Sequence, residues 1–91
     1  MQSKSKKPPN QLEKRWIELL AEQPCVVCGD WPVEIHEFEQ GNWFTAIPAC
    51  AACHRLDEGW HGTRQRWTLR RMDMLKAINK AVQRNFERVV K

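Results

Sequence analysis

The sequence predicts a small α+β domain that is stabilised by a zinc ion, and three observations support this prediction. Two C-x-x-C pairs, Cys25 with Cys28 and Cys50 with Cys53, stand 21 residues apart, and their four thiolates can surround one zinc ion. Two short β-like segments lie between the pairs, and apolar residues at helical spacing flank them on both sides. Because 91 residues bury only a modest core, a bound ion supplies stability that the core lacks.

The sequence gives no indication of export or of a membrane segment. Residues 1–9 are basic and end in two prolines, without the apolar stretch of a secretory signal. No apolar run approaches the roughly 20 residues that span a bilayer. We therefore expect a cytoplasmic protein with no membrane partner, in which reduced cysteines bind metal rather than form disulfides.

Charge is distributed unevenly along the chain, although the net charge is only +4. Residues 1–24 carry five Lys or Arg against three acids, which gives +2. Residues 25–63 carry one base against six acids, giving −5, and residues 64–91 carry nine bases against two acids, giving +7. An acidic, histidine-containing centre beside a basic segment fits a metal site next to a phosphate-binding surface, but a solvated basic helix explains the charge equally well.

The N-terminal part of the chain is predicted to be a flexible basic arm over residues 1–9, followed by a helix. Asn10 is a suitable N-cap, and Glu13 three residues later completes a capping-box pattern. Apolar residues then recur at helical spacing until Pro24, which cannot continue a helix. We predict an amphipathic helix over residues 11–22.

A β-hairpin is predicted between the two cysteine pairs. Residues 25–29 are typical of a zinc knuckle, a tight turn whose backbone wraps the ion. Residues 33–38 and 43–47 are predicted to be two short strands, joined through the turn signal Gln40-Gly41-Asn42. Pro48 is expected to close the second strand.

The second cysteine pair begins the C-terminal half of the predicted domain. Residues 50–53 are predicted to form another knuckle, and a short helix or turn is expected over 54–58. A long helix is predicted over about 64–89. Its apolar stripe consists of Trp67, Met74, Leu75, Ile78, Val82, Phe86 and Val89. Residues 25–63 thus form the centre of one domain that spans residues 10–91.

Three histidines fall within or just after the cysteine region, in the order Ile35-His36-Glu37, Cys53-His54 and Trp60-His61-Gly62. This order resembles the HNH endonucleases, whose ββα-metal unit clamps one divalent ion between a hairpin and a helix. The segments 32–36 and 47–50 are further similar to those of the phage recombination-enhancement nucleases, which act with RecA filaments.

The resemblance implies an HNH-like ββα-metal fold with flanking N- and C-terminal helices, and a metal-dependent DNA endonuclease of phage recombination or repair. It implies that His36, His54 and His61 bind a catalytic divalent ion (Mg²⁺, Mn²⁺ or Zn²⁺) in addition to the structural zinc. It also implies DNA as the substrate, a RecA-like filament as a partner, and a bacterial or phage-infected cell. Carboxylates that orient the imidazole rings are expected from Glu34, Glu39, Asp57 and Glu58.

The sequence departs from the resembled pattern at Glu37, where a second histidine usually acts as the general base. A carboxylate has an ordinary pKa of about 4.3 against about 6.5 for histidine, so it is the weaker base at neutral pH. Glu37 either serves as the base, joins the metal ligands, or leaves the enzyme slow or inactive. In a regular strand His36 and Glu37 also point to opposite faces, so they share a site only if the strand bends or ends there.

Binding to DNA is expected through the basic arm and through arginines that follow the histidine region. These arginines are Arg64, Arg66, Arg70 and Arg71. Of the five tryptophans, Trp16 and Trp67 are expected in the core. Trp31, Trp43 and Trp60 fall in or beside turns, where they either stack on bases or cover the zinc knuckles.

An alternative reading is a zinc module without catalytic activity that binds DNA or a recombinase. The glutamate at position 37 favours this reading, whereas the three histidines favour the nuclease, because a simple zinc ribbon does not need them. A protein-binding accessory factor is a third reading, supported only by the amphipathic helices.

Overall fold

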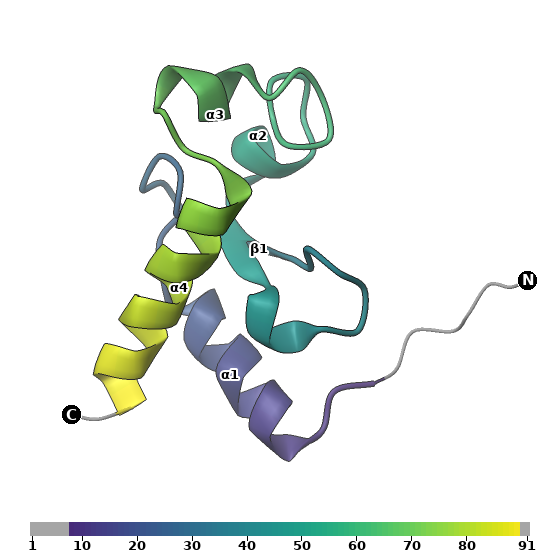
Figure 1. Ribbon diagram of the computed structural model, residues 1–91, viewed down its shortest axis with the longest axis vertical. Coiled ribbons are helices and arrows are strands. Elements are labelled where there is room, and N and C mark those ends of the chain that lie inside the picture. The colour runs from purple at the N-terminus through teal and green to yellow at the C-terminus, as the bar shows by residue number, and fades with distance from the viewer. Residues whose placement is uncertain (1–7, 90–91) are drawn as a thin grey trace, which may run out of the picture.

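A computed structural model describes residues 8–89 and confirms the α+β class. Most of the predicted basic arm, residues 1–7, lies outside the described part. The elements in chain order are α1 (Gln11–Ala21), β1 (Glu34–His36), the 3-10 helix η1 (Trp43–Thr45), β2 (Ile47–Ala49), α2 (Ala51–His54), α3 (Gln65–Leu69) and α4 (Met74–Val89). In Figure 1, α1 and α4 form the lower part of the molecule, and α2 and α3 lie together at its upper end.

Helix α1 forms where the capping pattern predicts it. The Asn10 side chain accepts a hydrogen bond from the Glu13 N–H at 2.8 Å, and the Glu13 side chain accepts one from the Asn10 N–H at 2.8 Å. This reciprocal pair satisfies two backbone donors that a helix start otherwise leaves without partners. Leu19 and Leu20 are buried on the inner face of the helix.

The sheet consists of two short antiparallel strands, in which Glu34 faces Ala49 and His36 faces Ile47. The predicted second strand over 43–47 was wrong, because residues 43–45 form η1 and β2 begins at Ile47. Alternation of residue types cannot distinguish a strand from a turn that buries Trp43 against the core.

Pro48 lies inside β2, although it was expected to close the strand. It pairs with Ile35, and its carbonyl accepts a hydrogen bond from the Val26 N–H at 3.0 Å. Each strand of a two-stranded sheet is an edge strand, where the missing proline N–H is tolerated. All three residues of β2 are buried, so this strand is the centre of the core.

The predicted helix over 64–89 is in fact two helices, α3 and α4, separated by residues 70–73. Arg71 has a φ of 53°, a left-handed conformation that no helix interior accepts. The Asp73 carboxylate then accepts a hydrogen bond from the Lys76 N–H at 2.8 Å, which caps the start of α4.

Helix α4 packs against α1 through a face that coincides only in part with the predicted stripe. Its buried residues are Met74, Ala77, Ala81 and Asn85. Leu75, Phe86 and Val89 are exposed. Small residues let two helices approach closely, so the contact face follows Ala77 and Ala81 rather than the largest apolar side chains. No helix within residues 8–89 is both long enough and apolar enough to cross a membrane.

Candidate metal centre

The four cysteines meet in one cluster that joins the turn after α1 to the start of α2. All four Sγ atoms lie within 4.8 Å of one another, and Cys28 Sγ is 3.6 Å from Cys50 Sγ. A tetrahedron with Zn–S bonds of about 2.3 Å has sulfur–sulfur edges of about 3.8 Å, whereas a disulfide bond measures about 2.05 Å. The cluster therefore has the geometry of a structural zinc site.

The surroundings of the sulfur atoms also favour a cation. Burial acts to raise the pKa of the Cys25 thiol, but hydrogen bonds from neighbouring backbone N–H groups outweigh it and lower the pKa from 9.0 to about 7. Burial raises the pKa values of Cys50 and Cys53. Four thiolates this close repel one another, so a bound Zn²⁺ is what allows all four to be ionised.

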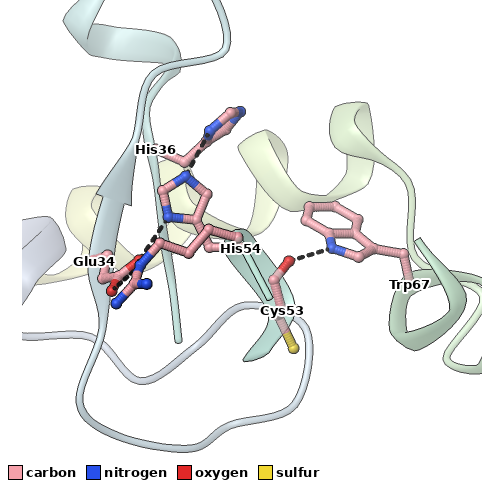
Figure 2. A network of polar contacts seen from close by, with 6 residues as sticks. Glu34, His36, Cys53, His54 and Trp67 are labelled. Carbon is pink, nitrogen blue, oxygen red and sulfur yellow. Dashed lines mark hydrogen bonds and ion pairs between the residues drawn. The ribbon is translucent and has the colours of Figure 1, made fainter. Parts of the chain in front are cut away.

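The three histidines form a second cluster, in which the ring nitrogens also lie within 4.8 Å of one another. His36 ends β1, His54 ends α2, and His61 lies in the turn that follows. The Nδ1 atom of His36 is 3.2 Å from the Nε2 atom of His54, as Figure 2 shows. Two nitrogens bound to one ion at about 2.0–2.1 Å stand about 3.0–3.4 Å apart, so this spacing fits a shared metal.

The three histidines differ in their exposure to solvent. His36 is buried, His54 is partly buried, and His61 is exposed. Three protein ligands with an open side are typical of catalytic metal sites, because the remaining coordination positions can take water or substrate. The exposed side at His61 is therefore where a substrate can approach.

Glu34 orients His54 from the side away from His36. Its Oε1 atom accepts a hydrogen bond from His54 Nδ1 at 2.8 Å, and both carboxylate oxygens accept from Arg55 Nε, at 3.0 and 2.9 Å (Figure 2). The hydrogen bond from His54 is the main reason why the pKa of Glu34 is lowered. Because the carboxylate accepts, Nδ1 carries the proton and Nε2 keeps its lone pair free for a metal.

Of the four carboxylates expected to orient the histidines, only Glu34 does so within residues 8–89. Glu39 accepts a hydrogen bond from the Asn42 side chain at 3.2 Å instead. Asp57 and Glu58 line a shallow surface hollow together with Arg66.

Glu37 is not grouped with the three histidines within the described residues. Strand β1 ends at His36, so Glu37 begins the loop that follows. Its Oε1 atom accepts a hydrogen bond from the Gly41 N–H at 3.0 Å. The carboxylate therefore closes a turn in this structure.

Two glycines fix the loop that carries His61, and this role was not predicted. A Cβ atom on Gly59 would lie 2.8 Å from the Ala52 carbonyl oxygen, and one on Gly62 would lie 2.1 Å from that of Asp57. Both positions accept only glycine, because any side chain collides with backbone. The close approach lets the His61 N–H donate to the His54 carbonyl at 3.0 Å, which holds the two histidines together.

The predicted DNA-binding arginines lie in different environments. Arg66 Nε donates to Cys53 Sγ at 3.2 Å, so this side chain belongs to the cysteine cluster. Arg64 lies over the Trp60 ring at 3.6 Å and donates to the Trp60 carbonyl at 2.8 Å. Arg70 and Arg71 are exposed between α3 and α4.

Four basic residues along α4 contact other parts of the protein. Each of them contacts a backbone carbonyl or a carboxylate on the neighbouring segments. The pairs are Lys76 with the Arg71 carbonyl, Lys80 with that of Val26, Arg84 with that of Pro24, and Arg88 with the Glu22 carboxylate. These residues therefore fasten α4 to α1 and to the first knuckle.

The prediction that Trp16 and Trp67 lie in the core is confirmed. Trp67 is buried, and its Nε1–H donates to the Cys53 carbonyl at 2.7 Å (Figure 2), while Trp16 packs partly buried against the core. Trp43 is buried, and the Trp60 ring lies 4.8 Å from that of Trp67. Only Trp31 among the five is largely exposed.

Comparisons with known protein families, with characterised proteins and with solved structures find no match for this chain. The two clusters of donor atoms are the structural features from which a function can be proposed. Three of the four cysteines are buried, which fits a structural ion, and His61 of the histidine cluster is exposed, which fits an ion that meets a substrate.

Proposed function

We propose that this protein is a metal-dependent DNA endonuclease of the HNH type, which hydrolyses phosphodiester bonds with one divalent ion. The observation that carries the proposal is the convergence of His36, His54 and His61 on one point with an open side. A divalent ion bound there supplies Lewis-acid stabilisation of the negative charge on the scissile phosphate. The nearby zinc cluster holds α2, and hence His54, in place.

The protein's part in this function is to present nitrogen lone pairs to the ion. Burial is the main reason why the pKa of His36 is lowered from 6.5 to about 4, and repulsion by His54 and His61 when those rings are protonated adds to it, so the His36 ring is neutral at pH 7. The Glu34 carboxylate accepts the proton of His54 Nδ1 in a hydrogen bond, so the lone pair on His54 Nε2 faces His36. Neutral imidazoles bind a divalent ion without cancelling its charge, so the ion remains a strong Lewis acid.

Glu37 is the residue that we assign as the general base for the attacking water. A carboxylate offers about four lone-pair sites, so Glu37 can accept a proton while its Oε1 atom keeps the hydrogen bond from the Gly41 N–H. A positioned general base contributes about 10²–10⁴-fold to rate, so a glutamate in this role predicts a slow enzyme.

A zinc module that binds DNA without cutting it is the second candidate. The hydrogen bond that the Glu37 carboxylate accepts from the Gly41 N–H favours this second candidate, because it gives the carboxylate a structural role in the loop after β1. In this reading the histidine cluster binds an ion that has no catalytic role.

Nicking of supercoiled plasmid in Mg²⁺ or Mn²⁺ tests the proposal. We compare the parent with His36→Ala, His54→Ala and Glu37→His, and use Glu39→His as a matched control for a new histidine on the same loop. We expect slow nicking by the parent, none by the two alanine variants, faster nicking by Glu37→His, and parental nicking by Glu39→His. If no variant nicks DNA while the zinc content and fold are intact, the binding-module reading replaces the nuclease.

A RecA-like filament is proposed as the setting for this cleavage. Nicking is therefore also measured with a recombinase filament paired to the plasmid. A rate that rises with the filament for the parent but not for His36→Ala supports this partner, and equal rates with and without it remove the partner from the proposal.

A further inference from the structure

Trp31 is placed differently from the other four tryptophans. It lies in the loop between the first knuckle and β1, and 57% of its surface is exposed, whereas Trp43 and Trp67 are 8% and 2% exposed. An exposed ring of this size offers a flat surface on which another planar group can stack.

A surface hollow of about 260 Å³ lies beside this ring. Its lining includes the apolar residues Trp31, Pro32 and Ala51 and the acidic residues Asp30 and Glu34. Two acids repel a phosphate group, whereas flat apolar walls and hydrogen-bond acceptors suit a neutral planar ring that carries amino groups. Among the parts of DNA, only a nucleobase has this chemistry.

The two carboxylates are not equivalent. Both oxygens of Glu34 are already engaged by His54 and Arg55. Within residues 8–89 the Asp30 side chain makes no hydrogen bond or ion pair, so its oxygens are available to accept from a ligand. Asp30 is therefore the acceptor that can read the amino group of a base.

The hollow shares a wall with the metal centre, because Glu34 lines the hollow and binds His54 as well. Cys50 also lines it, so the hollow adjoins the cysteine cluster. A base bound here would lie beside the Glu34 carboxylate that holds His54.

We infer that this hollow holds an unpaired nucleobase of the DNA strand, stacked on Trp31 with its amino group donating to Asp30. This inference deepens the proposed function and rests on it for DNA as the ligand. It assigns the substrate class: a strand with at least one unpaired, amino-bearing base (C, A or G) next to the phosphate at the histidines. A fully paired duplex hides the face of the base that Trp31 contacts.

Oligonucleotide binding by fluorescence anisotropy tests the inference. The ligands are single-stranded oligo(dC), a duplex of the same length, and an abasic oligomer with the same number of phosphates. The variants are Trp31→Ala, Trp31→Phe and, as a matched control, Phe38→Ala, which removes an aromatic ring that is 50% exposed just after β1. Zinc content and near-ultraviolet circular dichroism show that each variant is folded.

We expect Trp31→Ala to weaken binding of oligo(dC) by roughly 5–150-fold, the range found for loss of one stacked base. Trp31→Phe and Phe38→Ala should bind it nearly as the parent does, and the abasic oligomer should bind equally to all variants. Because stacking involves no phosphate, the salt dependence of Trp31→Ala should match that of the parent. Equal affinity of the parent for oligo(dC) and for the abasic oligomer would overturn the inference.

Asp30→Ala, which removes both acceptor oxygens, tests the polar half of the site. Oligo(dC) should bind this variant more weakly, while oligo(dT), whose base has no amino group, should bind the variant and the parent alike. An equal loss for both oligomers would show that Asp30 acts through the fold and would remove base reading from the inference.

The two proposals fail in different ways. Loss of binding in Trp31→Ala without plasmid nicking by any variant supports the base site and overturns the nuclease. Nicking that depends on His36, together with binding that is indifferent to Trp31, supports the nuclease and overturns the base site.

Discussion

At the scale of single residues, the histidine cluster depends on the carboxylate of Glu34. Glu34 and His36 are two residues apart in β1, so they project to the same face of the sheet, one on each side of the His54 ring. The carboxylate fixes which nitrogen of His54 carries the proton, and this determines whether Nε2 can bind a metal.

Removing this carboxylate should weaken metal binding at the histidines. We expect Glu34→Ala to lower the Mn²⁺ affinity of the zinc-loaded protein by about 10–100-fold, because the His54 ring loses its orientation. Glu34→Gln, which keeps an acceptor oxygen, should lose less, and Glu39→Ala should match the parent. Isothermal titration calorimetry measures all four proteins. Equal affinities for Glu34→Ala and Glu39→Ala would show that Glu34 does not control the site.

Arg66 and Arg70 are both arginines after the histidine region, but they should respond differently to replacement. Arg66 donates to Cys53 Sγ, so Arg66→Ala should speed zinc release to a chromogenic chelator, because a sulfur ligand loses its hydrogen bond. Arg70 is exposed, so Arg70→Ala should leave zinc release unchanged and reduce the salt slope of DNA binding by about one. The opposite pattern would return Arg66 to the DNA-binding surface.

At the scale of elements, spacing and capping predicted more than apolar periodicity did. The capping box at Asn10 and Glu13 located α1, and the C-x-x-C spacing brought four cysteines together. Both signals are local chemistry, which the rest of the fold does not change.

Periodicity failed where tertiary contacts decided the outcome. The stripe through Leu75 and Phe86 has helical spacing, yet the face of α4 that meets α1 is the one with Ala77 and Ala81. The hydrophobic pattern also continued across residues 70–73, where the helix breaks. Such a pattern does not reveal the left-handed conformation of Arg71 or the capping of α4 by Asp73.

The grouping of the three histidines was predictable from the sequence, whereas the contacts that support this grouping were not. The positions of His36, His54 and His61 relative to the cysteines indicated one cluster. The glycines at 59 and 62 gave a usable signal, since two glycines around a histidine suggest a close backbone approach. The hydrogen bond between the Glu37 carboxylate and the Gly41 N–H was not predictable from residue types or spacing.

Helices α1 and α4 are joined by a buried polar network centred on Asn85. Its Nδ2 donates to the Trp16 carbonyl at 3.1 Å, and its Oδ1 accepts from Gln23 Nε2 at 2.7 Å. Asn85→Ala leaves both partners buried without this contact, so we expect a loss of about 1–3 kcal/mol in the free energy of unfolding. Asn79→Ala, on the exposed side of α4, should change it by less than about 0.5 kcal/mol. Urea denaturation measures both, and similar values for the two variants would contradict a stabilising role for the network.

At the scale of the whole molecule, the cysteine cluster connects the two ends of the hairpin. Cys25 and Cys28 precede the strands, while Cys50 and Cys53 follow them. His54 directly follows Cys53 in α2, and the His61 N–H bonds to its carbonyl. The cysteine cluster is thus connected both to the sheet and to two of the three histidines, so we expect the arrangement of the histidines to depend on it.

Removal of zinc should therefore abolish Mn²⁺ binding at the histidines, although no histidine is changed. Without the ion, four close thiols must be protonated, and a core of this size does not hold the knuckles together. We expect Cys53→Ser, or the parent stripped by a strong chelator, to lose its cooperative thermal transition and its Mn²⁺ heat, and stoichiometric Zn²⁺ to restore both in the stripped parent. His61→Ala is the matched control, because it should lose Mn²⁺ binding yet keep zinc and the thermal transition. Calorimetry that found normal Mn²⁺ binding in the stripped protein would show that the histidine cluster is held by the hairpin alone.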